Sequence, residues 1–243
     1  YSLYPVLAKL EEAQLVCVPW NYGYALPMDA LLATKANAIF VANPNAPTGT
    51  FVSPEKFAEL ASAFTGLLLI DEAYADFADA NGLELLKRIP NLIVTRSFSK
   101  YYSLAGIRFG VAIADPATIR ELGKVKDSYN CDVLSLAAAT AAINDQDYYL
   151  GLRTKILKTR SRLHGELETL GFTVTSSQAN FLWCRRDKPV KPVYEALKRE
   201  QILIRYMSYP DYGDGLRISI GSDAENDRLL ADHAMFFSPT TIF

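Results

Sequence analysis

Four short apolar runs, each bounded by polar or turn-forming residues, are the feature that most constrains the fold of this chain. They cover residues 37–42, 66–70, 91–94 and 109–114. Each run is mostly apolar and too short for a buried helix, so each predicts a buried β-strand. Helical patterns precede the first two runs, which is the βαβ order of a parallel sheet. We therefore predict an α/β domain with a mostly parallel sheet.

Helix caps and periodicity place the other elements of this first part. We expect helices over residues 4–12, 29–32, 53–64, 115–126 and 133–143, and a further short strand over residues 14–18. Asp29 and Ser53 are expected to cap two of these helices, because short polar side chains accept hydrogen bonds from unpaired amides at a helix N-terminus. Asp115 with Pro116 is a third start signal.

A second part of the chain has a different order of elements. A long amphipathic helix is expected over residues 148–170, ending at Gly171, with its basic residues on a solvated face. After it we expect strands over residues 172–175, 180–184, 202–204 and 216–220, and helices over residues 190–200 and 223–236. We predict a large domain over residues 1–146 and a small C-terminal α+β domain over residues 147–243 that includes the linking helix.

Composition limits the kinds of partner. The 243 residues carry a net charge of −2 without basic runs, which gives no field for nucleic acid or an acidic membrane, so we expect a small-molecule partner. Cys17, Cys131 and Cys184 are widely spaced, which fits a reducing cytoplasm better than a disulfide framework or a zinc site. Only two histidines are present, so no metal site is expected.

Polar clusters follow three of the predicted strands, at the edge where parallel sheets bind ligands. They cover residues 43–49, 71–74 and 95–110. In the third cluster, Lys100 follows two hydroxyl residues and precedes Arg108 by eight positions. Such a mixture suits one covalent amine and one anion held nearby.

These clusters also carry a resemblance. Asn-Pro-Asn-Ala-Pro-Thr-Gly at 43–49, Asp-Glu-Ala-Tyr at 71–74 and the segment 97–108 resemble, in this order, the fold-type I pyridoxal-phosphate enzymes, specifically class I and II aminotransferases. Tyr-Ser-Leu-Tyr at 1–4 and Leu-Arg-Ile-Ser-Ile-Gly at 216–221 look most like histidinol-phosphate aminotransferases. The resemblance runs the full chain and implies a three-layer αβα large domain, a small C-terminal domain and pyridoxal 5'-phosphate as cofactor.

The resemblance also implies roles for single residues. Lys100 is the candidate for a Schiff base with the cofactor, and we expect it to lie partly desolvated beside Arg108, which would keep its amine unprotonated. A buried Asp71 would hold the ring nitrogen protonated. The other candidates are Tyr74 for the ring oxygen, Ser97, Ser99 and Arg108 for the phosphate, Tyr1 for stacking on the ring, and Arg217 for the substrate's α-carboxylate. The alternatives are a cap for Asp71, a surface arginine for Arg108 and a structural ion pair for Arg217.

The chain departs from the family pattern in two places. Ala46 stands where many relatives have the asparagine that contacts the ring oxygen, so Asn45 is the substitute candidate. Family members also begin well upstream of Tyr1, with a segment that helps to bind phosphate and substrate. We therefore expect residues 1–243 to fold at least in part, but to bind the cofactor weakly, to show negligible activity and to lose part of a homodimer interface that the longer protein would have.

The activity that the resemblance implies is amino transfer between histidinol phosphate and 2-oxoglutarate in histidine biosynthesis, with an amino donor and a 2-oxo acid as the small-molecule partners. Two alternatives on the same fold are an aromatic aminotransferase and a decarboxylase of amino-acid phosphates. A non-catalytic domain that binds pyridoxal phosphate is a third.

Overall fold

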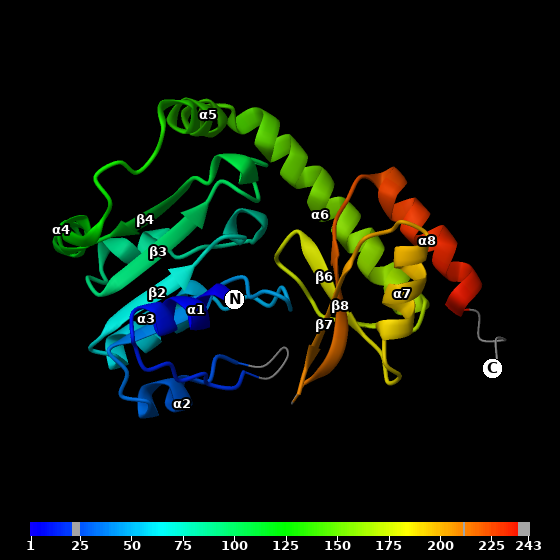
Figure 1. Ribbon diagram of the computed structural model, residues 1–243, viewed down its shortest axis with the longest axis horizontal. Coiled ribbons are helices and arrows are strands. Elements are labelled where there is room, and N and C mark those ends of the chain that lie inside the picture. Colours follow the sequence, from blue (N-terminus) through cyan, green and yellow to red (C-terminus); the bar gives the residue numbers. More distant parts are fainter. Residues whose placement is uncertain (21–24, 211, 238–243) are drawn as a thin grey trace. The chain divides into compact units, whose positions relative to one another are not determined.

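A computed structural model describes residues 1–20, 25–210 and 212–237, and side chains up to residue 231. The chain divides into two compact units (Figure 1). Unit 1 comprises Tyr1–Ala46 and Phe51–Ile143, and unit 2 comprises Pro47–Thr50 and Asn144–Phe243.

Unit 1 contains a four-stranded sheet in the order β1-β2-β3-β4. Its strands are β1 (Ala38–Ala42), β2 (Leu67–Asp71), β3 (Leu92–Ser97) and β4 (Gly110–Ala114). The first three strands are parallel, with Ala42 opposite Asp71 and Asp71 opposite Thr95, whereas β4 pairs with β3 antiparallel. The four strands and the mostly parallel sheet predicted from the apolar runs are confirmed.

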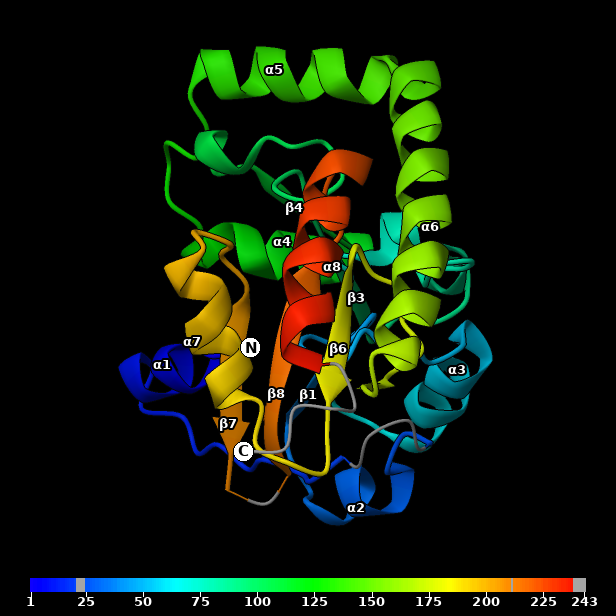
Figure 2. The ribbon, with the colours of Figure 1, turned by 90° about the vertical axis from the view of Figure 1, so that its right-hand side faces the viewer.

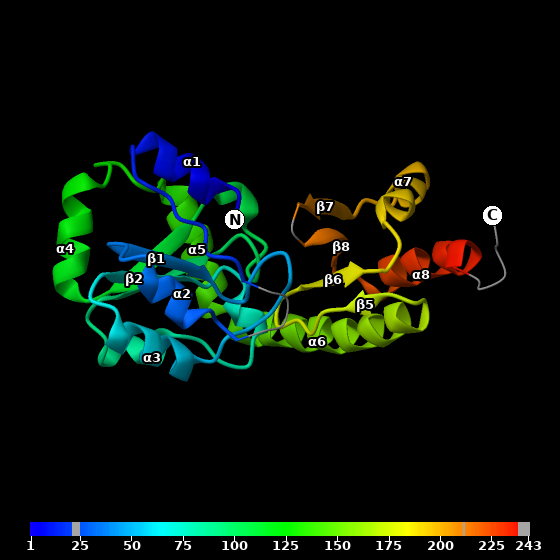
Figure 3. The same ribbon diagram turned by 90° about the horizontal axis from the view of Figure 1, so that it is seen from below.

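Helices lie on both faces of this sheet (Figure 3). The α-helices of unit 1 are α1 (Leu3–Leu10), α2 (Met28–Ala33), α3 (Pro54–Ala63), α4 (Pro116–Val125) and α5 (Val133–Asn144), and the 3-10 helices are η1 (Ala75–Phe77), η2 (Leu83–Lys87) and η3 (Ala105–Ile107). α2, α3 and η2 pack on one face, in a core built around Leu68, Ile70 and Leu92. α1 lies over the other face, where the ring centroids of Tyr4 and Phe40 are 5.8 Å apart. The α/β fold class is confirmed.

Unit 2 contains an antiparallel sheet in the order β5-β6-β8-β7. Its elements are α6 (Gln146–Thr169), β5 (Thr173–Val174), β6 (Phe181–Arg185), α7 (Lys191–Arg199), β7 (Arg205–Tyr209), β8 (Gly213–Ser219) and α8 (Asp223–Phe237). Figure 2 shows α6, α7 and α8 on one face of the sheet. A core of side chains such as Leu163, Leu182 and Leu216 fills the space between the helices and that face.

Two strand predictions are wrong. Residues 14–18 pair with none of the described strands, and Leu15 and Val16 are exposed there, so the apolar run has no buried face. Residues 202–204 are coil, and the strand begins at Arg205. Ile202 and Ile204 pack on the unit 2 core from that coil, so their apolar character reflects burial and not strand pairing.

Helix details also differ from expectation. Pro27 occupies the N-cap of α2, so Asp29 lies in the first turn and is not the cap. Asp115 does cap α4, accepting a hydrogen bond from the Ala117 amide at 2.8 Å. The basic face of α6 is only partly solvated, since Arg160 donates to the Ala179 carbonyl at 2.9 Å and Arg162 pairs with Asp227 at 2.7 Å. None of the described helices has the length and apolar character needed to cross a membrane.

Candidate active site

The ends of β1, β2 and β3 bring the three polar clusters to one edge of the unit 1 sheet. The Asn43 amide donates to the Asp71 carbonyl at 2.9 Å, and the Glu72 amide donates to the Thr95 carbonyl at 2.9 Å. Parallel pairing therefore continues one residue past β1 and β2. Segments that are far apart in the sequence are fixed side by side at this edge by the parallel register of β1, β2 and β3.

Asp71 is the last residue of β2, and its side chain is half-buried and not fully buried as expected. One carboxylate oxygen, Oδ2, accepts a hydrogen bond from the hydroxyl of Tyr4 on α1. The other, Oδ1, accepts one from the Ala73 amide at 3.1 Å. The carboxylate is thus oriented by the protein itself.

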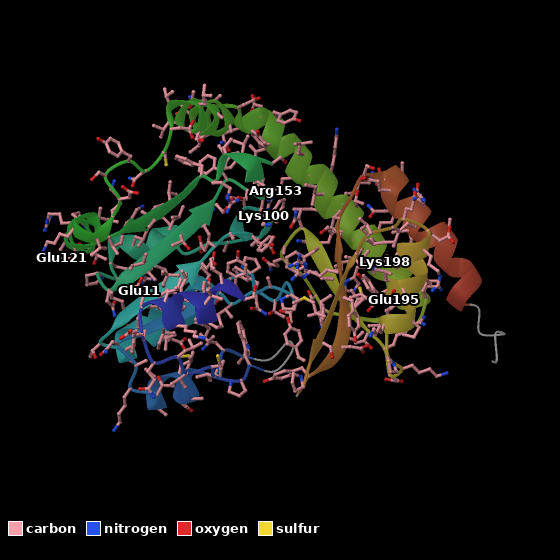
Figure 4. All side chains as sticks on the ribbon, in the orientation of Figure 1. Glu11, Lys100, Glu121, Arg153, Glu195 and Lys198 are labelled. Atoms are coloured by element: carbon pink, nitrogen blue, oxygen red, sulfur yellow. The ribbon has the colours of Figure 1, made fainter. Side chains whose placement is uncertain are left out.

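Lys100 follows β3 by three residues and is exposed (Figure 4). Its Nζ lies over the ring of Tyr74, 5.5 Å from the ring centroid. Among the described residues, the amine is therefore more open to solvent than expected. The structure does bring together the predicted amine and the predicted phenol.

The three predicted phosphate residues lie in the same segment. The Ser97 hydroxyl accepts a hydrogen bond from the Ser99 amide at 3.2 Å, which fixes the turn before Lys100. Arg108 is exposed and adopts a left-handed conformation at φ 53°, which is uncommon for a residue with a side chain. It donates to the Ala105 carbonyl at 2.8 Å, and this bond holds the guanidinium above its own loop.

The loop after β1 is closed by a residue to which the sequence analysis gave no role. The side chain of Asn43 donates to the Val52 carbonyl at 3.0 Å and accepts from the Val52 amide at 2.8 Å. Asn45 is half-buried inside the closed loop. Tyr1 is 69% exposed, and its ring meets that of Tyr4 edge-on at 5.6 Å. The stacking role of Tyr1 and the ring-oxygen role of Asn45 stay predictions.

A buried ion-pair network next to Asp71 was missed by the sequence analysis. The Glu72 carboxylate accepts hydrogen bonds from the Gly82 amide at 2.5 Å and from Arg96 Nε at 2.8 Å. A second guanidinium nitrogen of Arg96 pairs with Asp76 at 2.6 Å. Burial is the largest influence on Glu72 and raises its pKa, although Arg96 opposes this rise. The network ties the loop that carries Asp71 and Tyr74 to the strand that leads to Lys100.

Arg217 lies in β8 of unit 2, with its guanidinium over the Phe181 ring at 5.2 Å. Its Nε is buried and has no hydrogen-bond partner among the described residues. Arg205 of β7 is directly opposite Arg217 in the sheet register, so both side chains project from the same face. Burial raises the pKa of Tyr209, and the charges of Arg205 and Arg217 both oppose that rise. Arg205 was missed because the strand was predicted three residues too early.

No cluster of three or more His, Cys, Asp or Glu side chains in the part of the chain that the structure describes could hold a metal ion. The candidate groups are instead one oriented carboxylate, one amine beside a phenol, and hydroxyls with an arginine in one turn. The fold that carries these groups, with its mostly parallel sheet in unit 1, is that of the pyridoxal-phosphate-dependent transferases.

The sequence profile of the family "Aminotransferase class I and II" matches residues 1–232, and the chain belongs to this family. It is 46% identical over 239 residues to a histidinol-phosphate aminotransferase from Rhodopirellula baltica, covering 97% of this chain and 66% of that relative. It is 44% identical over 233 residues to one from Syntrophotalea carbinolica, covering 95% of this chain and 67% of the relative.

A solved structure extends the comparison to the fold. The crystal structure of histidinol-phosphate aminotransferase from Sinorhizobium meliloti in complex with pyridoxal-5'-phosphate superposes with a TM-score of 0.87 at 30% identity. The match covers 95% of this chain and 66% of that chain. The chain thus spans about two thirds of the length of these relatives.

Proposed function

We propose that this protein is a pyridoxal-phosphate-dependent aminotransferase that transfers an amino group between histidinol phosphate and 2-oxoglutarate in histidine biosynthesis. The observation that carries the proposal is the convergence of Asp71, Tyr74 and Lys100 at one sheet edge in a chain of the class I and II family. The names of the relatives at 46% and 44% identity support the choice of substrate.

The residues at this edge fit the cofactor chemically. Asp71 presents an oriented carboxylate, which suits a protonated ring nitrogen. Tyr74 offers a phenol for the ring oxygen, and the turn from Ser97 to Arg108 offers hydroxyls and a guanidinium for a phosphate. When bound, the cofactor supplies an electron sink for a carbanion at the substrate's α-carbon.

Lys100 carries two tasks in this proposal. As a neutral amine, its Nζ would hold the cofactor by condensing with the aldehyde with loss of water, and once the substrate amine has displaced it, Nζ would take the proton from the substrate's α-carbon and deliver it to a second carbon. The Tyr74 ring beneath Nζ limits the directions from which the amine can be approached. Ser97 fixes the turn that presents Lys100, so the amine is held by the strand and not by a free loop.

The arginine pair of unit 2 supports a strongly anionic substrate. Like charges directly opposite on neighbouring strands destabilise a sheet unless an anion relieves their repulsion. A phosphate ester meets this need, and a carboxylate meets it in the other half of an amino-transfer cycle. We propose that Arg217 binds the substrate's anionic group, with Arg205 as its neighbour.

Two further features belong to the proposal. The family resemblance and the three unpaired thiols support a cytoplasmic enzyme, and the resemblance supports a homodimer. An aromatic aminotransferase or a decarboxylase of amino-acid phosphates would retain Lys100 and Asp71. The Arg205 and Arg217 pair favours a phosphate-bearing substrate over a purely aromatic one, and release of carbon dioxide distinguishes the decarboxylase.

Borohydride reduction in the presence of pyridoxal phosphate, followed by peptide mapping, tests the cofactor site. We expect a single modified lysine, Lys100. Label on another lysine would contradict the site. Amino transfer to 2-oxoglutarate is then measured in a protein that includes the upstream segment expected for this family, from histidinol phosphate, from phenylalanine and from phosphothreonine, with carbon dioxide release in parallel. Preference for phenylalanine or release of carbon dioxide would favour one of the two alternatives.

A further inference from the structure

The carboxylate of Asp71 is held by two donors of different kinds among the described residues. The Ala73 amide binds Oδ1 from within the same turn, 3.1 Å away. The Tyr4 hydroxyl binds Oδ2 from α1, a helix 67 positions away in the sequence. The first bond forms with any compact turn after β2, whereas the second needs α1 to be docked on the sheet.

Tyr4 is the contact through which α1 meets the site. No residue of α1 is fully buried, but Tyr4 is half-buried, with its ring edge-on to Tyr1 at 5.6 Å and tilted against Phe40 at 5.8 Å. These ring contacts place the phenol so that its hydroxyl lies within hydrogen-bond distance of the Asp71 carboxylate.

The Tyr4 hydroxyl also remains a hydrogen-bond donor across the neutral pH range. Burial, followed by the charge and the hydrogen bond of Asp71, raises the Tyr4 pKa far above its ordinary value. Tyr4 therefore keeps its proton throughout the neutral range. Because an ionised carboxylate has about four acceptor positions, Asp71 can accept from Tyr4 and Ala73 and still accept from a third donor.

We propose that Tyr4 is a positioning residue, whose hydroxyl fixes the Asp71 carboxylate in the orientation that receives the ring nitrogen of the cofactor. This inference rests on the proposed function, in which Asp71 binds that nitrogen. With Ala73 alone, the carboxylate can rotate about its own bonds, and binding the cofactor then requires that rotation to be frozen. Because the Tyr4 hydroxyl already holds the carboxylate in the free protein, cofactor binding does not have to include this loss of conformational entropy.

The test compares cofactor binding in Tyr4→Phe with that in the unsubstituted protein. Phenylalanine keeps the ring contacts to Tyr1 and Phe40 and removes only the hydroxyl. We expect the dissociation constant for pyridoxal phosphate to rise about tenfold, the scale of one charge-assisted hydrogen bond. We also expect the absorption band of the bound cofactor to shift. Tyr194→Phe is the matched control, because it removes a hydroxyl from a unit 2 ring that packs on Tyr206.

A double-mutant cycle separates positioning from packing. If Tyr4 acts through the carboxylate, Tyr4→Phe has no further effect on cofactor affinity in the Asp71→Ala background. Equal losses in both backgrounds would mean that the Tyr4 hydroxyl acts independently of Asp71, and unchanged affinity in Tyr4→Phe would equally overturn the proposal. Failure of the proposed function has a different signature, since the unsubstituted protein itself would then bind no cofactor or carry it on a lysine other than Lys100.

Discussion

The sheets of units 1 and 2 present their candidate functional residues in opposite ways. In unit 1, Asp71 and Lys100 lie at or beyond the carboxyl ends of parallel strands, outside the packed core. In unit 2, Arg217 lies inside an antiparallel strand, and its neighbours Leu216 and Ile218 point into the core. Residues in strand-end loops can be substituted without disturbing the packing of the sheet. Residues within a strand alternate with core residues, so their substitution affects the core as well.

This difference separates two kinds of function. Strand-end loops place different chemical groups side by side, which suits bond making and proton transfer. An in-strand arginine has its direction fixed by the pleat, which suits recognition of an anion. Substitutions in unit 1 should therefore affect the chemical step most, and substitutions in unit 2 should affect substrate recognition or the stability of the sheet.

The largest effect is expected for Lys100→Ala. In a protein that includes the upstream segment expected for this family, removal of the proposed proton-transfer group should lower amino-transfer activity at least ~10³-fold and abolish borohydride labelling. Lys56→Ala is the control, because Lys56 forms only an exposed pair with Glu59 and its loss should change little. Normal borohydride labelling in Lys100→Ala would contradict the role of Lys100 and, with it, the assignment of the chemical step to unit 1.

Glu72→Ala tests how firmly the strand-end site of unit 1 is supported. It leaves the largely buried Arg96 with Asp76 as the remaining carboxylate of the network, and the expected loss is about 3 kcal/mol in the free energy of unfolding, measured with urea. Glu59→Ala, at an exposed ion pair, should lose less than about 1 kcal/mol. Similar losses in the two variants would show that the network does not stabilise the loop.

Arg217→Lys tests recognition in unit 2. Lysine keeps the charge but loses the planar fork, so kcat/KM for anionic substrates should fall by roughly 1.5–3 kcal/mol, about 10- to 150-fold. Cofactor labelling at Lys100 should be unchanged. Steady-state kinetics decide this, with Arg162→Lys in the surface network with Asp227 as control. Kinetics equal to those of the unsubstituted protein would make Arg217 a structural residue.

Gly215→Ala tests the packing of the unit 2 sheet. A Cβ at this position would collide with the Trp183 ring, and the side chain of Trp183 is fully buried. We expect a loss of about 1–3 kcal/mol in thermal unfolding of the protein. Gly151→Ala in α6 meets no atom within 4 Å, so it should be neutral or slightly stabilising. A harmless Gly215→Ala would mean that Trp183 can move aside.

The smallest effect concerns pH. Because burial raises the pKa of Glu72 in the folded protein, the unfolded chain releases this proton first as pH rises. The resulting stabilisation is complete below the unfolded pKa and is lost as pH rises through the folded value. The advantage of the unsubstituted protein over Glu72→Gln should therefore shrink with rising pH in this window. Urea titrations at several pH values measure it, and an advantage that grows would show the opposite shift.

The fold was largely predictable because its signals are local. The apolar runs of β1 to β4 each identify a strand without reference to the rest of the chain, and Asp115 marks the start of α4 through its own side chain. The run at residues 14–18 has the same local signal, but it has no partner strand among the described residues. An apolar run indicates that a segment can be buried. Whether it pairs as a β-strand depends on the segments that pack beside it.

The sequence by itself determined the α/β class, the order of the polar clusters, and the identities of Asp71, Tyr74 and Lys100 as candidates. Only the tertiary structure decided that Tyr4 and Ala73 together orient Asp71, that Glu72 pairs with Arg96, and that Arg205 stands opposite Arg217. The physical reason is distance along the chain. A cap or an apolar period is set by neighbouring residues, whereas a hydrogen bond across 67 positions or a strand register exists only after the elements have packed.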